Sequence, residues 1–557
     1  MNSDIQAEGS SPVIEAIFPD PLATLAELED RYPRRDLPEG AMVTRVGPSP
    51  TGFMHIGTLY VGLLSERFAH QTGGACFIRI EDTDKKREIE GAADFIFRAF
   101  EHFDVAFDEG CGSDAATSGR YGPYTQSRRS AIYHSGVKHL LEQGLAYPCF
   151  CTAEELEGVR ARQQARGARP GYYGEWALWR DRSAADVTEA LSRGTPYVIR
   201  FKSGGDIERK VRVEDLIYGD RLVAENDQDI VIMKSDRLPT YHLAHILDDH
   251  LMRTTHVIRG DEWLPSLPTH VQLFDAFGWT PPAYAHIAPI NKMDGSSKRK
   301  LSKRKDPEAS VSYFVDLGYP AGALIEYLLN LANSNFEDWR KAHPLADYRE
   351  FTVSFEKLGN SNGPLFDFVK LDSISRDVVA RLSTADLSAG LIAWAKIHDP
   401  TFIALLETDP EYTMRILDIE RDGPKVRKDL AKWSDVRPEI ECFFDSEFRQ
   451  TRAAENPLIE NLADVVPPIV KAFMETYNPD DDREVWFDKI KAIARDNGFA
   501  EKAGDFKRNP EAFRGTVADV AKVFRVILTG RAQTPDLHSV MRAMGQERVF
   551  ARLSDAL

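Results

Sequence analysis

Residues 41–80 constrain the fold more than any other part of this 557-residue chain. AMVTRV is typical of a short buried strand, and GPSPTG after it is a turn in which each proline restricts the residue before it. Helical spacing of apolar residues follows from His55, at Ile56, Leu59, Tyr60, Leu63, Leu64 and Phe68. The pair Gly73-Gly74 ends that helix, and ACFIRI is a second strand. This strand, tight turn, helix and strand predict the start of a doubly wound parallel sheet, the α/β class.

The composition excludes several other classes of protein. With 43% hydrophobic residues and no run of about 20 apolar residues, the chain is globular and no membrane span is expected. Lys and Arg number 70 against 87 Asp and Glu, a net charge of −17, which argues against coating nucleic acid through net charge but leaves a local basic track open. The first residues lack the basic and apolar regions of a secretory signal. Five cysteines are an odd and small number for a chain of this length, which argues against a disulfide framework. We therefore expect a protein of the reducing cytoplasm.

Patterning along the rest of the chain predicts an interrupted α/β domain followed by a mostly helical half. YVIRF and VRVEDLIYGDRLV are typical of an antiparallel insertion, and DIVIMKS, YHLAHILDDHLM and THVIRG restore the alternation of strand and helix. Beyond about residue 310, amphipathic helical segments dominate. The predicted segments are an acidic N-terminal extension (1–40, nine acidic and three basic residues), a first half-domain (41–148), an insertion (149–228), a second half-domain (229–290), a region with a basic loop (291–378) and a helical region (379–557).

Two features could carry chemistry. In doubly wound sheets, ligands bind beyond the carboxyl ends of the strands, which is where GPSPTGFMHIG lies, and the helix that starts near His55 offers free N–H groups to an anion. The second feature is KRKLSKRK at 298–305, whose lysines could fold over a triphosphate. Alone, the first is more simply a structural turn with a surface histidine, and the second a solvated basic loop.

Together these features resemble the HIGH and KMSKS signatures of the class I aminoacyl-tRNA synthetases. The match narrows because VTRVGPSPTGFMHIG, FIRIEDTDKKR, LPTYHLAHILDDH and HVIRGDEWLPSLPTH resemble the glutamyl-tRNA synthetase family in order and spacing. The resemblance is strong over residues 41–330, and the helical remainder follows the family only in its general plan.

The resemblance implies a fold, a reaction and partners. The fold is a Rossmann-like doubly wound parallel sheet with an inserted acceptor-binding domain (149–228), a KMSKS loop and stem-contact region (291–378) and a mainly α-helical anticodon-binding region (379–557). In the reaction, L-glutamate and MgATP give glutamyl-adenylate and pyrophosphate, and glutamate then passes to the 3′-terminal adenosine of tRNA(Glu). The cofactors are ATP, as substrate, and Mg²⁺. The partners are L-glutamate and tRNA(Glu), with tRNA(Gln) as a second candidate acceptor, and we expect a monomer that does not bind membranes.

Residue by residue, the resemblance also implies a site. The predicted glutamate pocket is formed by Arg45, Gly47, Ser49, Glu81, Tyr241, His245 and Arg259. The predicted ATP site is formed by Pro50, Thr51, Gly52, His55, Gly57, Thr58, Glu262, Lys300, Leu301, Ser302, Lys303 and Arg304. Of these, His55 and Lys303 are the expected catalytic residues, because they would stabilise the phosphates.

The charges of this set suit the substrate. A dicarboxylate with an ammonium group requires two cations and one anion, and Arg45, Arg259 and Glu81 supply them, with arginine offering bidentate geometry to a carboxylate. Arg259 is expected to pair with the side-chain carboxylate and Arg45 to lie nearer the α-carboxylate, with the division between the two left open. An arginine facing the side chain also disfavours glutamine, so no editing domain is required.

Some residues depart from the family pattern. Thr58 replaces the second histidine of the signature, His245 stands where many relatives carry Asn, and Gly47 where Ala is common. The last two put the finer contacts of the amino-acid pocket in doubt.

Cys149 and Cys151 match only half of a zinc site found in some relatives. Trp176 and its neighbours stand where the other ligands are expected, and a closed structural site requires about four. We therefore predict two buried thiols and no zinc. By family analogy, GPKVRKDLAKW (423–433) is a candidate tRNA contact, although charged helix faces are common.

Three alternatives remain at this stage. A glutaminyl-tRNA synthetase is disfavoured by Arg259. A shorter glutamyl transferase that modifies a tRNA base should lack the helical half. A catalytically inactive paralogue that binds RNA should have lost His55, Lys303 or Glu81, and all three are present.

Overall fold

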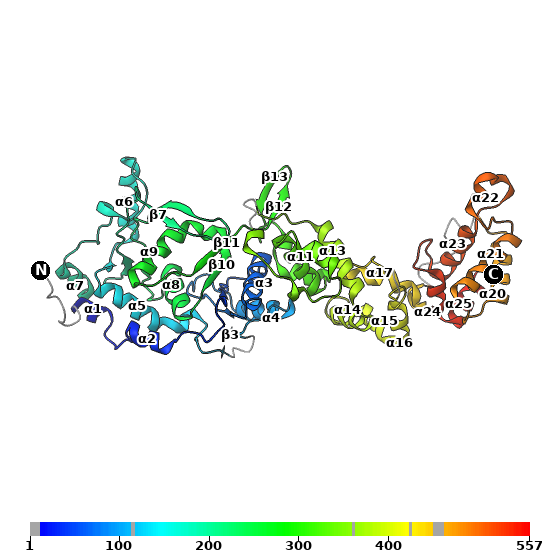
Figure 1. Cartoon of the computed structure of the whole chain (residues 1–557), viewed down its shortest axis with the longest axis horizontal. Coiled ribbons are helices and arrows are strands. Elements are labelled where there is room, and N and C mark those ends of the chain that lie inside the picture. The colour runs from blue at the N-terminus through cyan, green and yellow to red at the C-terminus, as the bar shows by residue number, and fades with distance from the viewer. Residues whose placement is uncertain (1–11, 113–116, 359–362, 423–425, 449–461) are drawn as a thin grey trace. The chain divides into compact units, whose positions relative to one another are not determined.

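The computed structural model describes residues 12–112, 117–358, 363–422, 426–448 and 462–557 (Figure 1). Its contacts divide the chain into two compact units. The first consists of Met1–Tyr313 and Leu328–Asp367, and the second of Phe314–Tyr327 and Phe368–Leu557. None of the helices in the described ranges is long and apolar enough to cross a membrane.

The first unit is built on a parallel sheet that confirms the predicted strand, turn, helix and strand. β1 (Val43–Val46) pairs in parallel with β2 (Ala75–Ile78), and both strands are buried along their whole length. Strands buried on both faces are typical of a sheet that is covered on both sides. The crossover helix is α3 (Ile56–His70), and the sheet continues through β3 (Glu109–Cys111), which is parallel, to β4 (Thr117–Ser118), which is antiparallel. The helices that follow β2 and β4 are α4 (Ala92–His102) and α5 (Ser130–Glu142).

The second half of this α/β fold returns after the insertion. β10 (His256–Gly260) and β11 (Ala283–Ile287) are parallel, and the Thr255 backbone N–H donates to the Val43 carbonyl, which places β10 beside β1. Helix α8 (Tyr241–Leu251) precedes β10 and α9 (Leu267–Phe277) follows it. The carboxyl ends of β1, β2 and β10 therefore supply the edge at which a ligand is expected.

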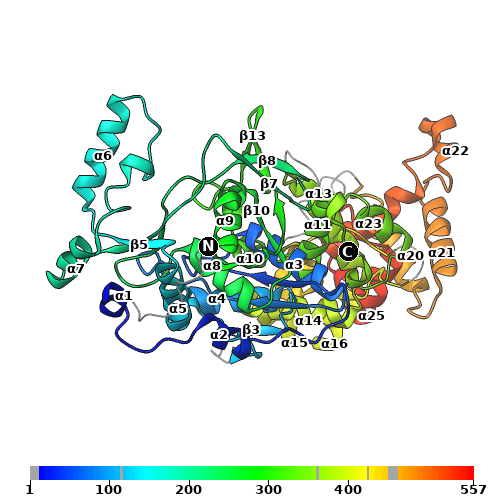
Figure 2. The same cartoon turned by 60° about the vertical axis from the view of Figure 1, so that its left-hand side comes forward.

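The insertion is antiparallel, as predicted. β5 (Ala146–Cys149), β6 (Val198–Phe201) and β9 (Val231–Met233) form one sheet, and β7 (Lys210–Val213) and β8 (Arg221–Ala224) form a hairpin. Two helices, α6 (Ala153–Ala165) and α7 (Ala184–Ser192), lie between β5 and β6 in the sequence. In Figures 1 and 2, α6 stands out from the sheet of the insertion.

Within the predicted N-terminal extension, residues 12–40 pack into the first unit. α1 (Pro12–Ile17) and α2 (Leu25–Arg31) bury Ile17, Phe18, Leu28 and Tyr32 in the same clusters as α5, β1 and the end of α8. The Arg35 guanidinium binds both Glu109 carboxylate oxygens at 2.9 Å. The acidic composition of this segment concealed its few apolar anchors, and residues 1–11 lie outside the described ranges.

Beyond these elements come a hairpin and then helices. β12 (Asn291–Asp294) pairs with β13 (Ser297–Lys300). No strand occurs in the described residues after Val311, as the sequence predicts. The helices are α10 (Val311–Leu317), α11 (Ala321–Ala332), α12 (Phe336–Ala342), α13 (Phe368–Arg381), α14 (Thr384–His398), α15 (Pro400–Thr408), α16 (Pro410–Leu417), α17 (Val436–Ile440), α18 (Asp445–Phe448), α20 (Val466–Thr476), α21 (Arg483–Asp496), α22 (Ala503–Arg508), α23 (Val517–Thr529), α24 (Leu537–Met544) and α25 (Gln546–Ser554).

A continuous apolar core joins the helices of the second unit from Val379 to Leu553. Of the candidate tRNA segment at 423–433, residues 423–425 lie outside the described ranges. The Arg427 guanidinium is ion-paired with Asp429 two residues on, and Trp433 is buried. Residues 426–432 are irregular rather than a charged helix face.

Candidate active site

The turn after β1 places His55 at the start of α3. His55 caps the helix, and its Nδ1 accepts the backbone N–H of Gly57 at 2.9 Å, so the neutral ring carries its proton on Nε2. Burial, with Lys303 nearby, lowers the pKa of His55 to about 4. The ring is therefore neutral at pH 7 and acts as a hydrogen-bond donor.

The KLSKR loop is held by a buried carboxylate. Asp306 accepts two hydrogen bonds from the Arg299 guanidinium, at 2.6 and 2.8 Å, and one from the Ser302 backbone N–H at 2.9 Å. On the other side of the loop, the Lys303 ammonium group hydrogen-bonds the Phe53 carbonyl. The loop is thereby fixed against the signature turn.

These contacts bring the predicted ATP-site residues together. One group is on the turn and helix start: Pro50, Thr51, Gly52, His55, Gly57 and Thr58. The other is on the loop: Lys300, Leu301, Ser302, Lys303 and Arg304. Glu262 lies 3.4 Å from the Lys300 ammonium group. Backbone N–H groups at a helix start beside lysine ammonium groups form a surface suited to phosphate.

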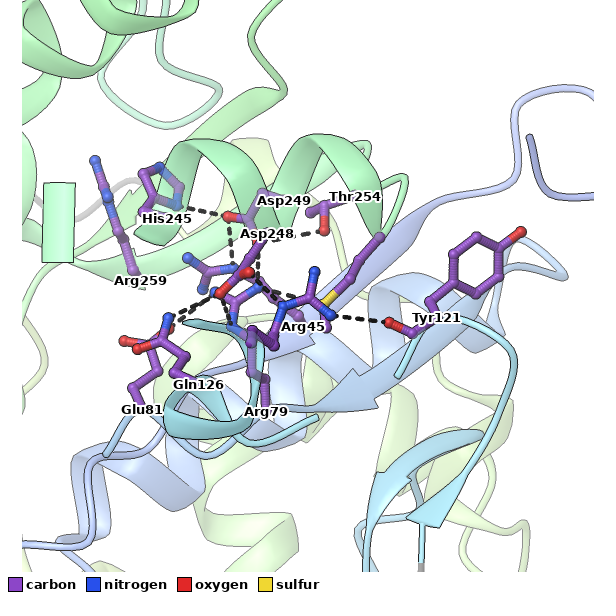
Figure 3. A network of polar contacts seen from close by, with 12 residues as sticks. Arg45, Arg79, Glu81, Tyr121, Gln126, His245, Asp248, Asp249, Thr254 and Arg259 are labelled. Atoms are coloured by element: carbon purple, nitrogen blue, oxygen red, sulfur yellow. Dashed lines mark hydrogen bonds and ion pairs between the residues drawn. The ribbon is translucent and has the colours of Figure 1, made fainter. Parts of the chain in front are cut away.

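Three buried arginines and three carboxylates form what we call the paired-arginine cluster: Arg45, Arg79, Arg129, Glu81, Asp248 and Asp249. Figure 3 shows the two aspartates of α8 between the guanidinium groups. Asp249 lies 3.2 Å from Arg45 Nε and 2.7 Å from Arg79 Nη1, and Arg79 Nη2 reaches Glu81 Oε1 at 2.9 Å. Burial alone would raise the pKa of Asp249, but Arg45 and Arg79 outweigh it and hold that pKa well below its usual value.

Asp248 serves the opposite side of this cluster. Its carboxylate accepts hydrogen bonds from Arg129 Nε at 2.6 Å, from the Gln126 amide at 2.9 Å and from the Tyr133 hydroxyl at 2.9 Å. Arg129 also donates to the Tyr121 carbonyl at 3.2 Å (Figure 3). Each charge of the cluster thus has an opposite charge within reach.

Arg259 lies in a different environment, the Arg259 pocket, which we define by Arg259, Tyr241, His270 and His286. Its Nε donates to His286 Nε2 at 2.9 Å, its Nη1 to the Tyr241 hydroxyl at 2.9 Å, and its Nη2 lies 3.2 Å from His270 Nδ1. The side chain is only 5% exposed, yet it forms no ion pair with any residue in the described ranges. Burial lowers the pKa of both histidines, so the partners of this guanidinium are neutral.

His245 stands between the two arrangements. Its Nδ1 lies 2.6 Å from the Asp249 carboxylate, its Nε2 lies 2.9 Å from the Tyr284 hydroxyl, and its ring stacks on Tyr241 with centroids 5.6 Å apart. Burial lowers the pKa of His245 to about 3, and Arg259 contributes to the shift (Figure 3). His245 is therefore neutral, with Nδ1 close beside the Asp249 carboxylate.

Gly47 gives the Glu81 carboxylate room beside the first turn. A Cβ at position 47 would lie 2.3 Å from Glu81 Oε1, so the observed placement of the carboxylate requires glycine. Burial raises the pKa of Glu81 in spite of Arg79 and Arg45. Ser49, the remaining predicted pocket residue, is exposed on the turn.

Several residues of the site were not predicted. Arg79 lies two residues before Glu81 in the second motif, and strand alternation could have placed both on one face. Asp248 and Asp249 stand in the third motif and could have been suspected as paired acids. His270 closes the fourth motif and could have been suspected with them. Other residues carried no local signal: Gln126, Arg129, Asp215 and His286.

The two cysteines of the insertion face a tyrosine. The Tyr172 hydroxyl lies 3.3 Å from the Sγ atoms of both Cys149 and Cys151; Cys149 is buried and Cys151 is half-buried. Trp176, where a further ligand would be expected, is buried instead. No group of three or more His, Cys, Asp or Glu side chains that could hold a metal ion occurs in the described part of the chain. The expectation that the protein binds no zinc stays a prediction.

Comparisons with known proteins agree on one family. The profile of the tRNA synthetases class I (E and Q), catalytic domain, matches residues 41–372, and that of an anticodon binding domain matches residues 509–557. A glutamate–tRNA ligase of Clostridium perfringens is 47% identical, over 96% of this chain and 98% of that protein. One from Sorangium cellulosum is 45% identical, over 95% and 97%. The crystal structure of a glutamate tRNA ligase from Elizabethkingia meningosepticum in complex with its amino acid has a TM-score of 0.71 and 27% identity, covering 92% of this chain and 99% of that one.

Proposed function

The chain belongs to the class I aminoacyl-tRNA synthetases as a glutamate–tRNA ligase, and from that premise we propose that the Arg259 pocket binds the side-chain carboxylate of glutamate. The enzyme activates L-glutamate with ATP and charges tRNA(Glu), as the sequence resemblance implies. The α/β fold with a helical anticodon-binding region is likewise confirmed.

One observation supports the proposal above all. A buried cation is costly unless it meets an opposite charge. Arg45, Arg79 and Arg129 all have aspartates within 3.2 Å, whereas the described partners of Arg259 are a phenol and two neutral imidazoles. Three of its five N–H groups are engaged in these contacts, which leaves two for a carboxylate. Glutamine would bring an amide to this guanidinium in place of an anion.

The other end of the substrate is assigned to the cluster nearby. Arg45 uses Nε for Asp249, and its Nη groups would bind the α-carboxylate. Glu81, beside Gly47, would accept the ammonium group while Arg79 holds the other side of the carboxylate. Tyr241, His245 and Ser49 would complete the pocket. When glutamate is held in this way, an oxygen of its α-carboxylate can attack the α-phosphorus of ATP, with pyrophosphate as the leaving group.

His55 and Lys303 would stabilise that step. Neutral His55 would donate Nε2–H to a phosphate oxygen, and Lys303 would exchange the Phe53 carbonyl for the charge that develops on the leaving group. Lys300, Lys303 and the helix N–H groups around them suit phosphate oxygens, and the nearby Glu262 carboxylate is paired with Lys300. Mg²⁺ commonly binds through substrate phosphates and would arrive with ATP, where it would neutralise phosphate charge. The adenylate would then be esterified by the 3′-terminal adenosine of tRNA.

Further parts of the assignment concern partners. We propose that the enzyme acts as a monomer in the cytoplasm, where its substrates ATP and tRNA occur, and that tRNA(Gln) is a second possible acceptor. The preserved His55, Lys303 and Glu81 argue against an inactive paralogue, and the helical half argues against a base-modifying transferase.

A charging assay tests this assignment. Purified protein is given MgATP, labelled glutamate or glutamine, and separate transcripts of tRNA(Glu) and tRNA(Gln). Glutamate on tRNA(Glu) alone indicates a discriminating enzyme, and glutamate on both tRNAs a non-discriminating one. Charging with glutamine alone would overturn the Arg259 assignment.

A further inference from the structure

We propose that Asp215, acting through His286, is a positioning residue that fixes the orientation of the Arg259 guanidinium and so sets the affinity for glutamate. The inference rests on the proposed role of Arg259. It concerns a residue of the insertion that lies outside the four motifs of the family.

Asp215 lies in the turn between β7 and β8, and this turn docks on β11. The Leu216 backbone N–H donates to the Tyr284 carbonyl at 2.8 Å. Asp215 Oδ1 accepts the backbone N–H groups of Ile217 and Tyr218 at 2.9 and 2.8 Å. Its Oδ2 accepts the backbone N–H of His286 at 3.1 Å and lies 2.6 Å from His286 Nδ1. The carboxyl group is buried, at 2% exposure, so its acceptor capacity is directed at these four groups.

The chemistry of this chain of contacts permits one arrangement of protons. A carboxylate only accepts, so His286 Nδ1 must carry a hydrogen. Burial, with Arg259 nearby, lowers the pKa of His286, so the ring is neutral and Nε2 is left as an acceptor. Arg259 Nε always donates, and it meets Nε2 at 2.9 Å. The opposite tautomer would place two donors against each other.

The consequence is a guanidinium held at the nitrogen nearest its stem. With Nε fixed by His286 and the Nη groups steadied by Tyr241 and His270, the guanidinium plane cannot turn about its stem. Bidentate binding of a carboxylate depends on the direction of that plane. Asp215 therefore contributes to glutamate affinity without touching the substrate.

Asp215→Asn is the first test. The amide either places its NH₂ group toward His286, which forces the proton onto Nε2 against Arg259, or places it toward two backbone donors. We expect the KM for glutamate to rise about ten-fold or more, while kcat and the KM for ATP change less than about three-fold. Asp220→Asn is the matched control, because Asp220 lies in the same turn and pairs on the surface with Arg212. It should leave all three constants unchanged.

Variants of His286 provide a second test, which holds even if the turn between β7 and β8 does not fold in Asp215→Asn. His286→Gln keeps an acceptor for Arg259 and a donor for Asp215, so glutamate KM should stay within about three-fold of the parent; His286→Leu keeps neither, and should raise it about ten-fold. In the His286→Leu background, Asp215→Asn should add little, because its effect passes through the imidazole.

The outcomes distinguish a failure of the positioning role of Asp215 from a failure of the proposed glutamate pocket. If His286→Leu leaves glutamate KM unchanged while Arg259→Ala destroys glutamate use, the positioning role is wrong and the pocket stands. If Arg259→Ala itself leaves glutamate use intact, the proposed pocket is wrong. Additive effects of the Asp215 and His286 changes would also overturn the positioning role, since they would indicate two independent structural defects.

Discussion

The paired-arginine cluster and the Arg259 pocket bury the same kind of side chain in the same unit, but they treat its charge differently. Arg45, Arg79 and Arg129 meet carboxylates of α8, whereas Arg259 meets Tyr241, His270 and His286. In a buried ion pair each charge neutralises the other, so removing one partner lowers the stability of the fold. A buried cation with neutral partners is satisfied only when an anion arrives. The difference separates residues that build the site from one that selects its ligand.

Arg259→Ala should break this comparison most strongly. Because the substrate carboxylate loses its only proposed cation on this side, kcat/KM for glutamate should fall about 10³-fold or more. The KM for ATP should change less than about three-fold, and the unfolding free energy by less than about 1 kcal/mol, since no ion pair is broken. Arg259→Lys is the matched control. It keeps the positive charge without the planar, bidentate guanidinium group, and should recover only part of the activity. Unchanged kcat/KM in the alanine variant would contradict the assignment.

Asp249→Ala is the counterpart in the cluster. It leaves Arg45, Arg79 and His245 without their shared acceptor, so the unfolding free energy should fall by about 3–5 kcal/mol, as measured by urea denaturation. Asp236→Asn, which alters an exposed pair with Lys234, should stay within about 0.5 kcal/mol of the parent. A loss at position 249 no larger than that of the control would show that the cluster does not stabilise the fold.

His245 stands between the two regions, and its titration sharpens the contrast. Its pKa is about 3 in the folded chain, against 6.5 for an ordinary histidine, so below pH 6.5 only the unfolded chain takes up the proton. Stability therefore falls as the pH drops from 6.5 toward 3, by about 2 kcal/mol at pH 5. His245→Asn has no proton to gain, and its unfolding free energy should fall less between pH 7 and pH 5. If the unfolding free energies of variant and parent fell in parallel with pH, His245 would not be a buried neutral imidazole.

Gly47→Ala should give the smallest effect, at the border of the cluster. The new methyl group would displace the Glu81 carboxylate from its place beside the turn, where a Cβ comes within 2.3 Å of Oε1. Because that carboxylate is the end of a flexible side chain, the KM for glutamate should rise only about two- to five-fold, with the KM for ATP unchanged. Steady-state kinetics with each substrate varied in turn would check this. An effect on ATP alone would place Glu81 elsewhere in the reaction.

Sequence patterns predicted the parts of the molecule whose signal is local. β1, the proline turn and α3 follow from the spacing of apolar residues and from prolines that act on their immediate neighbours. Glu81 and Arg259 lie inside recognisable motifs, although their assignment remains a proposal. Arg79 was missed even though it stands two residues before Glu81, because a buried arginine just after β2 can be explained only once Asp249 is placed opposite it.

Contacts between distant segments could not be predicted in this way. Asp215 and His286 meet because a turn of the insertion docks on β11, and no spacing within either segment indicates that docking. The packing of residues 12–40 could not be predicted for a related reason. The acidic composition describes the segment as a whole, whereas its packing against the first unit depends on a few apolar side chains, such as Leu28 and Tyr32.

That attachment has a consequence for the order in which the chain folds during synthesis. The Tyr32 carbonyl accepts a hydrogen bond from Arg253 Nε at 2.8 Å, and the Arg35 guanidinium donates to the Met252 carbonyl at 3.1 Å. These partners leave the ribosome more than 200 residues after the segment that binds them. Residues 28–35 emerge before their partners and are thus among the last to dock, closing a long loop over an α/β domain that must already be assembled. Until then, Leu28 and Tyr32 are exposed apolar surface on a nascent chain, where a chaperone can bind them.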